Sequence, residues 1–453
     1  MKLKKKNIGI HCDLLIRHCA VLSDAWELRE DQAVAIQDGK IAAIESEDQG
    51  LALQGDTVFD AAGKLLLPGF VDGHTHVCQQ LLRGRTTDEY PMIWTRFLVP
   101  FESNLQPEDV GLSTRLACLE MIKAGITAFA DAGGVHMDQA AEAVAESGMR
   151  AALCRSTMDM GAGIPDSMKE SPAEHIRHTE DLYRAYHGSA DGRVSIWCGL
   201  RQVMTCSPGL IRESAQMARN YRTGLHAHLC EHKDEVSFCL QNYKKRPAAF
   251  LDEMQALGPN LLTAHNVMLS EGDISLLAKR GVKIVHCPQA NLANHGFPKT
   301  PRILEAGLSV GIGNDGASAV ALDMFEQMRI LKNGVLAYWG LPVFDPLVLP
   351  TRTLLLMATL GGAEALGLGD RLGKIAPGRE ADLILVDLRQ PHLYPSQNPA
   401  HTLVACASGR DVTDVFIGGK PVMRNREVLT LDEEKILAHS ASKMRAIIRR
   451  ADI

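Results

Sequence analysis

The sequence predicts an α/β protein, namely a (β/α)8 TIM barrel with a small β-sandwich domain formed by both ends of the chain. Between about residues 65 and 315, apolar strand-like runs alternate with helical stretches, which is the pattern of repeated βα units. Short strands and two-residue hairpin signals, Asp38-Gly39 and Gly418-Gly419, flank this region. A chain of 453 residues would suggest about three domains of about 150 residues, but α/β barrels run well beyond that length as one unit.

The predicted domain boundaries lie where the pattern of strands and helices changes. Residues 1–66 and 373–430 form the two parts of the β-sandwich, 67–372 form the barrel, and 431–453 form a C-terminal helix. The barrel needs eight strands, which we place at Leu65–His76, Thr127–Ala132, Arg150–Ser156, Val194–Arg201, Gly224–His228, Leu261–His265, Val282–Cys287 and Ser309–Asp315. One helix between them is expected to begin at Pro107 and to end near Gly125. The segment 77–106 has few regular signals and is a candidate lid over the active face.

Composition limits the function classes. Hydrophobic residues make up 46% and charged residues 23%, the net charge is -6, and no basic face stands out, so nucleic acid is not the expected partner. No run of 18 apolar residues predicts a membrane span. The lysines from Lys2 to Lys6 are not followed by an apolar signal core, and the eleven cysteines contain no C-x-x-C pair. We therefore expect buried thiols in the cytoplasm.

A histidine pair lies at the end of the first barrel strand. His74 and His76 are two residues apart, so on an extended strand their side chains point the same way and can converge on one ion. An isolated His-x-His is often incidental, but further polar residues end later strands. They are His226, His228 and Glu231 after the fifth strand, His265 after the sixth, His286 after the seventh and Asp315 after the eighth. In such barrels the active site lies at these strand ends.

These residue types suit a catalytic metal. Such a site holds three or four protein ligands and leaves a position open, and bound water becomes a nucleophile as its pKa falls towards about 7. His74, His76, one of the fifth-strand histidines and Asp315 are the candidate ligands. Glu231 is placed to donate a proton to the substrate, and His265 to orient the water. For Asp315 the alternative interpretation is a helix cap, and for His286 it is a structural histidine without a functional role. Nine further histidines lie in predicted helices or loops and are given no role: His136, His175, His178, His187, His232, His295, His392, His401 and His439.

The chain resembles the amidohydrolase superfamily, in its branch of nucleobase and nucleoside deaminases and triazine hydrolases. The resemblance rests on the stretches 67–76, 228–231, 264–265, 286–288, 314–316 and 373–383. It implies one divalent metal, zinc first and iron second, held by His74, His76, His228 and Asp315. It also implies that Glu231, His265 and Asp315 transfer protons. No strand-end lysine matches the carboxylated bridge of the binuclear branches.

Two signals for the substrate ring disagree. The stretches 81–84, 94–102 and 315–329 look like the thiomethyladenosine and S-adenosylhomocysteine deaminases, which implies a substrate contact for Trp94. The family's Ser-Asn-x-Lys-Leu pattern is absent at 290–294, however, and Arg201 stands where those enzymes carry a histidine. Arg201 and Gln79 instead stand at positions that resemble those of guanine and 8-oxoguanine deaminases.

The chemistry of Arg201 and Gln79 favours the second signal. A guanidinium and an amide together suit a carbonyl next to a ring N–H. The alternative is that Arg201 pairs with a neighbouring carboxylate, because a buried arginine needs a partner either way.

We therefore predict a metal-dependent aminohydrolase that releases ammonia from a purine-like ring, with a slight preference for an oxo-amino ring of the guanine, 8-oxoguanine or pterin type. Alternatives are a thiomethyladenosine, S-adenosylhomocysteine or adenosine deaminase, or a triazine chloro- or aminohydrolase. Rivals of another class are a barrel that only binds a ligand and a protein with a structural metal, although structural zinc sites are usually closed and rich in cysteine. We expect a small heteroaromatic substrate, no nucleic-acid or membrane partner, and a homo-oligomer.

Overall fold

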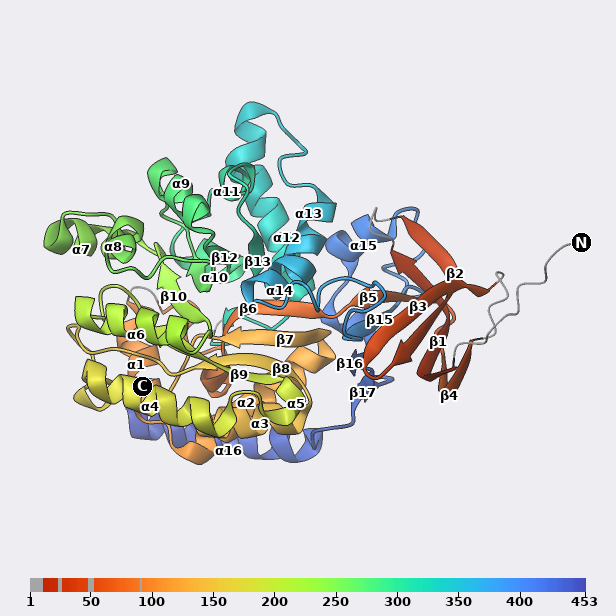
Figure 1. The fold of residues 1–453 in the computed structure, drawn as a ribbon, viewed down its shortest axis with the longest axis horizontal. Helices are drawn as coiled ribbons and strands as arrows, with labels where there is room; N and C mark the ends of the chain where they lie inside the picture. The colour runs from red at the N-terminus through yellow and green to blue at the C-terminus, as the bar shows by residue number, and fades with distance from the viewer. Residues whose placement is uncertain (1–10, 23–26, 48–52, 90–91, 319) are drawn as a thin grey trace, which may run out of the picture.

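The computed structural model describes residues 11–22, 27–47, 53–89, 92–318 and 320–453. The N-terminal lysines considered above lie outside these ranges. The described chain contains two nine-stranded sheets, one at each end of the long axis in Figure 1. No helix among the described residues is long and apolar enough to cross a membrane.

Parallel strands in chain order form the larger sheet, which runs β13-β12-β11-β10-β9-β8-β7-β6-β14. The strands are β6 (Phe70–His76), β7 (Ile126–Asp131), β8 (Arg150–Cys154), β9 (Val194–Leu200), β10 (Leu225–Leu229), β11 (Leu261–His265), β12 (Lys283–His286), β13 (Val310–Ile312) and β14 (Asp315–Gly316). Only two residues separate β13 from β14, and β14 pairs with β6, so the order closes into a ring. This arrangement confirms the predicted barrel.

Two of the predicted barrel strands are divided in the structure. The run Leu65–His76 becomes β5 (Lys64–Pro68) in the smaller sheet and β6 in the barrel, because the chain changes sheets at Gly69. A Cβ at Gly69 would lie 2.2 Å from Thr127 Oγ1, so only glycine fits this crossing. The run Ser309–Asp315 is likewise interrupted between β13 and β14, and Asp315 has a positive φ of 66°.

Helices follow the strands and cover the barrel (Figure 1). They are α1 (Val99–Ser103), α2 (Pro107–Lys123), α3 (Met137–Ser147), α4 (Pro172–Tyr186), α5 (Ser189–Gly192), α6 (Pro208–Asn220), α7 (Lys233–Tyr243), α8 (Pro247–Glu253), α9 (Glu271–Arg280), α10 (Pro288–Asn294), α11 (Thr300–Glu305), α12 (Met324–Val335), α13 (Thr351–Leu356) and α14 (Gly362–Ala365). The predicted helix at Pro107 is α2, which begins with a capping box between Gln106 and Asp109. It ends next to Gly125, whose φ is 81°.

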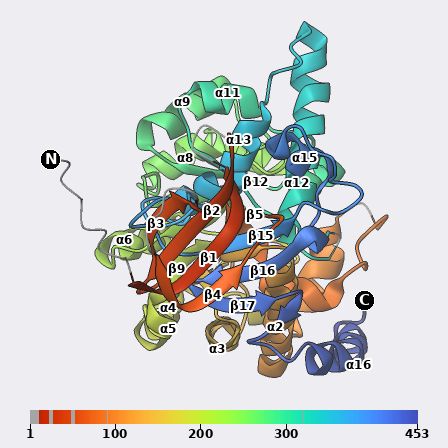
Figure 2. The ribbon, with the colours of Figure 1, turned by 90° about the vertical axis from the view of Figure 1, so that its right-hand side faces the viewer.

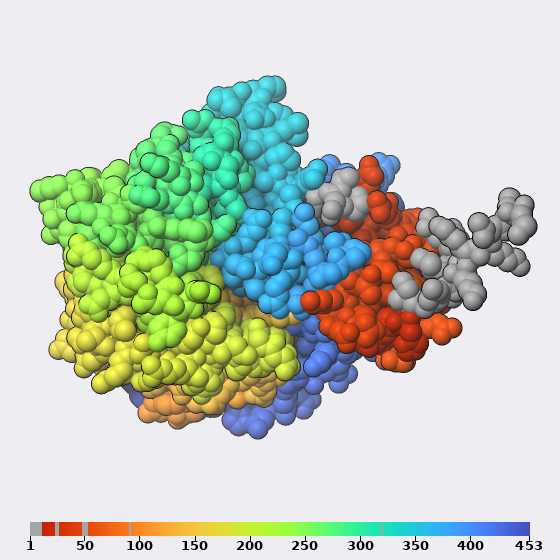
Figure 3. Space-filling model, in the orientation of Figure 1, coloured from red at the N-terminus to blue at the C-terminus, as the bar shows by residue number. Residues whose placement is uncertain are grey.

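Both ends of the chain build the smaller sheet, as predicted. Its strands are β1 (His11–Leu22), β2 (Leu28–Gln37), β3 (Lys40–Ser46), β4 (Gln54–Asp60) and β5, joined by β15 (Leu383–Asp387), β16 (Val412–Ile417), β17 (Lys420–Arg424) and β18 (Glu427–Val428). Figure 2 shows β15 and β16 beside the N-terminal strands, and the space-filling view shows red and blue residues in contact there (Figure 3). Phe59 of β4 meets Phe416 of β16 edge to face, with ring centroids 5.6 Å apart, although these strands do not pair. The sheet therefore encloses an apolar core of its own.

Both predicted hairpins are confirmed. Asp38-Gly39 joins β2 to β3 and Gly418-Gly419 joins β16 to β17, and all four residues have positive φ. Between β15 and β16 the chain passes through α15 (Pro399–Cys406), and after β18 it ends in α16 (Glu433–Ala451), which lies below the barrel in Figure 1.

The candidate lid contains more regular structure than its sequence indicates. A 3-10 helix spans Val77–Leu82, a π-helical turn spans Trp94–Leu98, and α1 follows directly. Trp94 is partly buried and packs against an apolar cluster made of Val99, Met158, Ile164 and Met168. Residues of the lid thus lie against the loop that follows β8.

Candidate active site

Strand β6 places the histidine pair. All seven of its residues are buried, and His74 and His76 both point to the end of the barrel where β14 joins. The Asp72 carboxylate accepts the backbone N–H of His74 at 3.1 Å, and it also accepts the side-chain amide of Asn314 at 2.7 Å. This carboxylate therefore ties the β6 strand to the short link between β13 and β14.

Four donor atoms converge at this end of the barrel. Asp315 Oδ1 lies 3.7 Å from His74 Nε2 and 3.5 Å from His76 Nε2. His228 Nε2 lies 3.3 Å from His76 Nε2. The side chains come from β6, β10 and β14, which are far apart in sequence and are brought together by the closure of the barrel. Three imidazoles and a carboxylate are the donor set that was predicted as metal ligands.

The structure separates the two histidines of the fifth barrel strand. His228 belongs to a donor group with His74 and His76 whose ligand atoms all lie within 4.8 Å of one another. His226 lies one layer deeper, where its Nε2 shares a hydrogen bond with His74 Nδ1 at 2.8 Å. His226 therefore orients the His74 ring, as hydrogen-bonded partners behind metal-bound histidines do.

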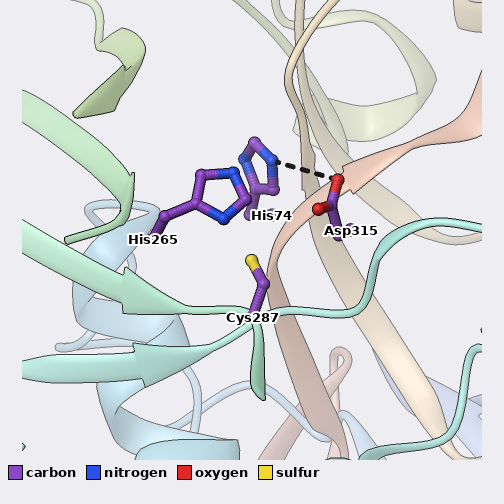
Figure 4. Close-up of side chains that lie close together, drawn as sticks. All are labelled: His74, His265, Cys287 and Asp315. Atoms are coloured by element: carbon purple, nitrogen blue, oxygen red, sulfur yellow. Dashed lines mark ion pairs between the residues drawn. The ribbon is translucent and has the colours of Figure 1, made fainter. Parts of the chain in front are cut away.

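Unpartnered nitrogens test whether a metal fits. His74 Nε2 and His265 Nε2 are buried and have no hydrogen-bond partner among the described residues. Figure 4 shows His74, His265, Cys287 and Asp315 gathered around one space, with a dashed line between His74 and Asp315. Burial raises the pKa of the Cys287 thiol well above its ordinary value, so the imidazoles and the carboxylate are the better donors. The residues present fit a divalent metal.

Burial and mutual contact set the protonation of the group. Burial lowers the pKa of His74, His76 and His228, which keeps these rings neutral, as metal ligands must be. Burial would raise the pKa of Asp315, but the nearby His74 and His265 side chains lower it below its usual range. Asp315 is therefore a carboxylate.

Glu231 lies beside this group, just past β10. Its Oε2 accepts a hydrogen bond from Gln202 Nε2 at 2.9 Å. Its Oε1 lies 3.2 Å from His295 Nε2 and 3.9 Å from His265 Nε2. Burial would raise the pKa of Glu231, but His265 and His295 together lower it. Asn291 Nδ2 in turn lies 2.9 Å from His265 Nδ1.

The predicted substrate residues occupy a second polar group. The Arg201 guanidinium makes a two-pronged pair with Glu102, at 3.0 Å for Nη1–Oε2 and 3.2 Å for Nη2–Oε1. Gln79 Nε2 donates to the same carboxylate at 2.6 Å. All three side chains are buried. The structure thus realises the alternative weighed from the sequence, in which Arg201 pairs with a carboxylate, while contacts of Gln79, Arg201 and Trp94 with a substrate stay a prediction.

The sequence gives no functional prediction for three of these residues. Glu102 lies in the candidate lid, Gln202 directly follows Arg201, and His295 is the C-cap of α10. His286 lies deeper and shares a hydrogen bond with the backbone oxygen of His265, and burial lowers its pKa to about 4. The position of Gln202 at a strand end was a usable signal, but no local pattern marks Glu102 or His295.

Comparison with known proteins places these features in context. A model of the amidohydrolase family matches residues 65–422. A 5-methylthioadenosine/S-adenosylhomocysteine deaminase of Pelotomaculum thermopropionicum is 40% identical over 394 residues, covering 86% of this chain and 88% of that protein. A 5'-deoxyadenosine deaminase of Methanosarcina acetivorans is 35% identical over 446 residues, covering 97% and 99%.

Two solved structures with bound zinc are also similar to this chain. An adenosine deaminase from Xanthomonas campestris with bound zinc superposes with a TM-score of 0.90 at 31% identity, covering 97% of this chain and 99% of that one. An atrazine chlorohydrolase from Arthrobacter aurescens, complexed with zinc, superposes with a TM-score of 0.83 at 26% identity, covering 95% and 100%.

Proposed function

The chain belongs to the amidohydrolase family as a deaminase-type hydrolase of carbon–nitrogen bonds, and we propose that it removes the amino group of adenine in 5'-modified adenosines. The observation that supports the chemistry most directly is the convergence of His74, His76, His228 and Asp315 next to the Glu231 carboxylate.

These four residues would hold one divalent metal, and zinc-bound structural neighbours support zinc. When bound, such a metal lowers the pKa of water and so supplies the nucleophile for the amino-bearing ring carbon. The Glu231 carboxylate, held between Gln202 and His295, would take the first proton that the attacking water loses and deliver it to the adjacent ring nitrogen. His265 Nε2 and Asp315 Oδ1 face the same space and transfer the second proton, so that the amino group leaves as ammonia.

Two observations support an adenosine-type substrate. The relatives at 40% and 35% identity are named as deaminases of 5-methylthioadenosine/S-adenosylhomocysteine and of 5'-deoxyadenosine. Within the site, the donors of Arg201 and Gln79 point at Glu102. The slight preference for an oxo-amino ring required those donors for a ring carbonyl, and the comparisons do not confirm it. The adenosine-type alternative is therefore the better supported one.

A substrate panel tests the proposal. We would measure ammonia release by zinc-loaded protein with 5'-methylthioadenosine, S-adenosylhomocysteine, 5'-deoxyadenosine, adenosine, guanine, 8-oxoguanine and atrazine. We expect turnover of the adenosines, lost in Glu231→Gln and kept in the exposed control Glu427→Gln. Turnover of guanine or atrazine with no turnover of adenosines would contradict the proposed substrate class. Undiminished activity in Glu231→Gln would contradict the proton-transfer role.

The remaining expectations accompany this proposal. All eleven cysteines are free thiols and ten are buried, which supports a reducing compartment such as the cytoplasm. We also propose a homo-oligomer, which light scattering of the purified protein would test.

A further inference from the structure

Glu231 is held on both carboxylate oxygens by side chains from different loops. Gln202, after β9, contacts Oε2 at 2.9 Å, and His295, after α10, lies 3.2 Å from Oε1. The backbone N–H of Glu231 is itself bound by Glu235 Oε2 at 3.0 Å. A carboxylate with one partner on each oxygen cannot rotate about its last bond without losing both contacts.

The backbone around His295 is well anchored. Its N–H donates to Asn291 O at 2.8 Å, and the N–H of Gly296 donates to the same oxygen at 3.0 Å. Phe297 then packs so closely against α12 that a Cβ at Gly334 would lie 2.2 Å from its ring. Asn291 also contacts His265, so one short helix sets the positions of both histidines that face Glu231.

We propose that His295 is a positioning residue for Glu231, which with Gln202 forms a two-sided clamp on the carboxylate that delivers the proton. This inference rests on the proposed function, because it assigns a task to the side chain that protonates the ring. His295 directly follows the stretch 290–294, where the chain departs from the pattern of the family it resembles.

The reason for a clamp is geometric. Proton transfer requires the carboxyl oxygen within hydrogen-bond reach of the ring nitrogen, and small misplacement of a reacting group costs large factors in rate. His265, 3.9 Å away, is too distant to hold Oε1 by itself. The ring of His232 packs against that of His295, with ring centroids 5.4 Å apart.

Steady-state kinetics on the best adenosine of the panel test the clamp. We expect His295→Ala to lower kcat by about ten- to hundredfold, the usual range for losing a hydrogen bond to a charged group, with little change in KM. His295→Gln, which keeps an N–H at similar reach, should recover most of this loss. The exposed His401→Ala is the matched control and should behave as the unaltered protein. Equal kcat in His295→Ala and the unaltered protein, or no recovery in His295→Gln, would overturn the proposal.

A double variant separates positioning from a general structural effect. If His295 and Gln202 hold one carboxylate, the loss in kcat of His295→Ala/Gln202→Ala should be smaller than the product of the single losses. Losses that multiply would mean two independent roles and would overturn the clamp.

Urea unfolding provides a readout that needs no turnover. A cycle of His295→Ala and Glu231→Ala should show a coupling of at least about twofold in the unfolding constant if the two side chains hold each other. If the unaltered protein released no ammonia from any substrate of the panel, the proposed function would be overturned, but this cycle would still be measurable. If the effects of the two single variants on the unfolding constant simply multiply in the double variant, the clamp would be overturned whatever the substrate proves to be.

Discussion

Replacement of Glu102 by alanine should destabilise the fold strongly. The Arg201–Glu102 pair is buried on both sides, with side-chain exposures of 3% and 1%. Without Glu102, the only other side-chain contact recorded for the guanidinium among the described residues is Ser156 Oγ at 3.4 Å. Breaking a buried pair by removing one partner leaves an uncompensated charge and costs about 3–5 kcal/mol.

The size of this effect can be compared within the same chain. Arg280 and Asp252 make a similar two-pronged pair, at 2.7 and 3.0 Å, but their side chains are 46% and 27% exposed. Loss of such an exposed pair in Asp252→Ala should cost only about 0–1 kcal/mol. The double variant Arg201→Met/Glu102→Leu removes both charges and should recover most of the stability lost in Glu102→Ala.

Urea unfolding of the four proteins at pH 7 measures these differences. A cost for Glu102→Ala no larger than that for Asp252→Ala would refute the reasoning. It would mean that Arg201 does not depend on Glu102, and that its guanidinium is available to a substrate. The oxo-amino substrates predicted from Arg201 and Gln79 would then gain support, so the stability measurement also bears on specificity.

Two further predictions concern the metal and the barrel wall. Elemental analysis should find one zinc per chain, and His76→Ala should lose both this zinc and ammonia release. Chelation should abolish activity, and added zinc should restore it. Full zinc content in His76→Ala would contradict the proposed ligand set. Gly69→Ala should lower the free energy of unfolding by about 1–3 kcal/mol because its Cβ would overlap Thr127. Gly209→Ala, with the nearest atom 3.7 Å from the new Cβ, should cost nothing, and equal stability of both glycine variants would show that the close approach at Gly69 is easily relieved.

Several features of the site follow from local sequence. A spacing of two residues on a strand puts His74 and His76 on one face, and the structure keeps both in one donor group. Glycines and an aspartate mark the two hairpins because their positive φ values suit few other residues. The alternation of strands and helices predicts the barrel because each βα unit can bury its apolar face only against its neighbours.

Strand geometry left the choice between His226 and His228 open, and only the family resemblance favoured His228. Both point to the same side of β10, and their depth in the barrel decides which one lies against His76 and which one supports His74 from behind. Depth in a barrel depends on the stagger of its strands around the ring, which no single segment contains.

The sequence alone therefore determined the fold class, the strand-end positions of the candidate metal and proton-transfer residues, and the family resemblance. Only the tertiary structure decided the partners of those residues. Glu102 reaches Arg201 across 99 residues of chain, and His295 reaches Glu231 from the end of a different βα unit. Periodicity and turn chemistry depend on residues only a few positions apart in the sequence. The partner of a buried charge depends instead on the paths of all the loops that meet at the mouth of the barrel.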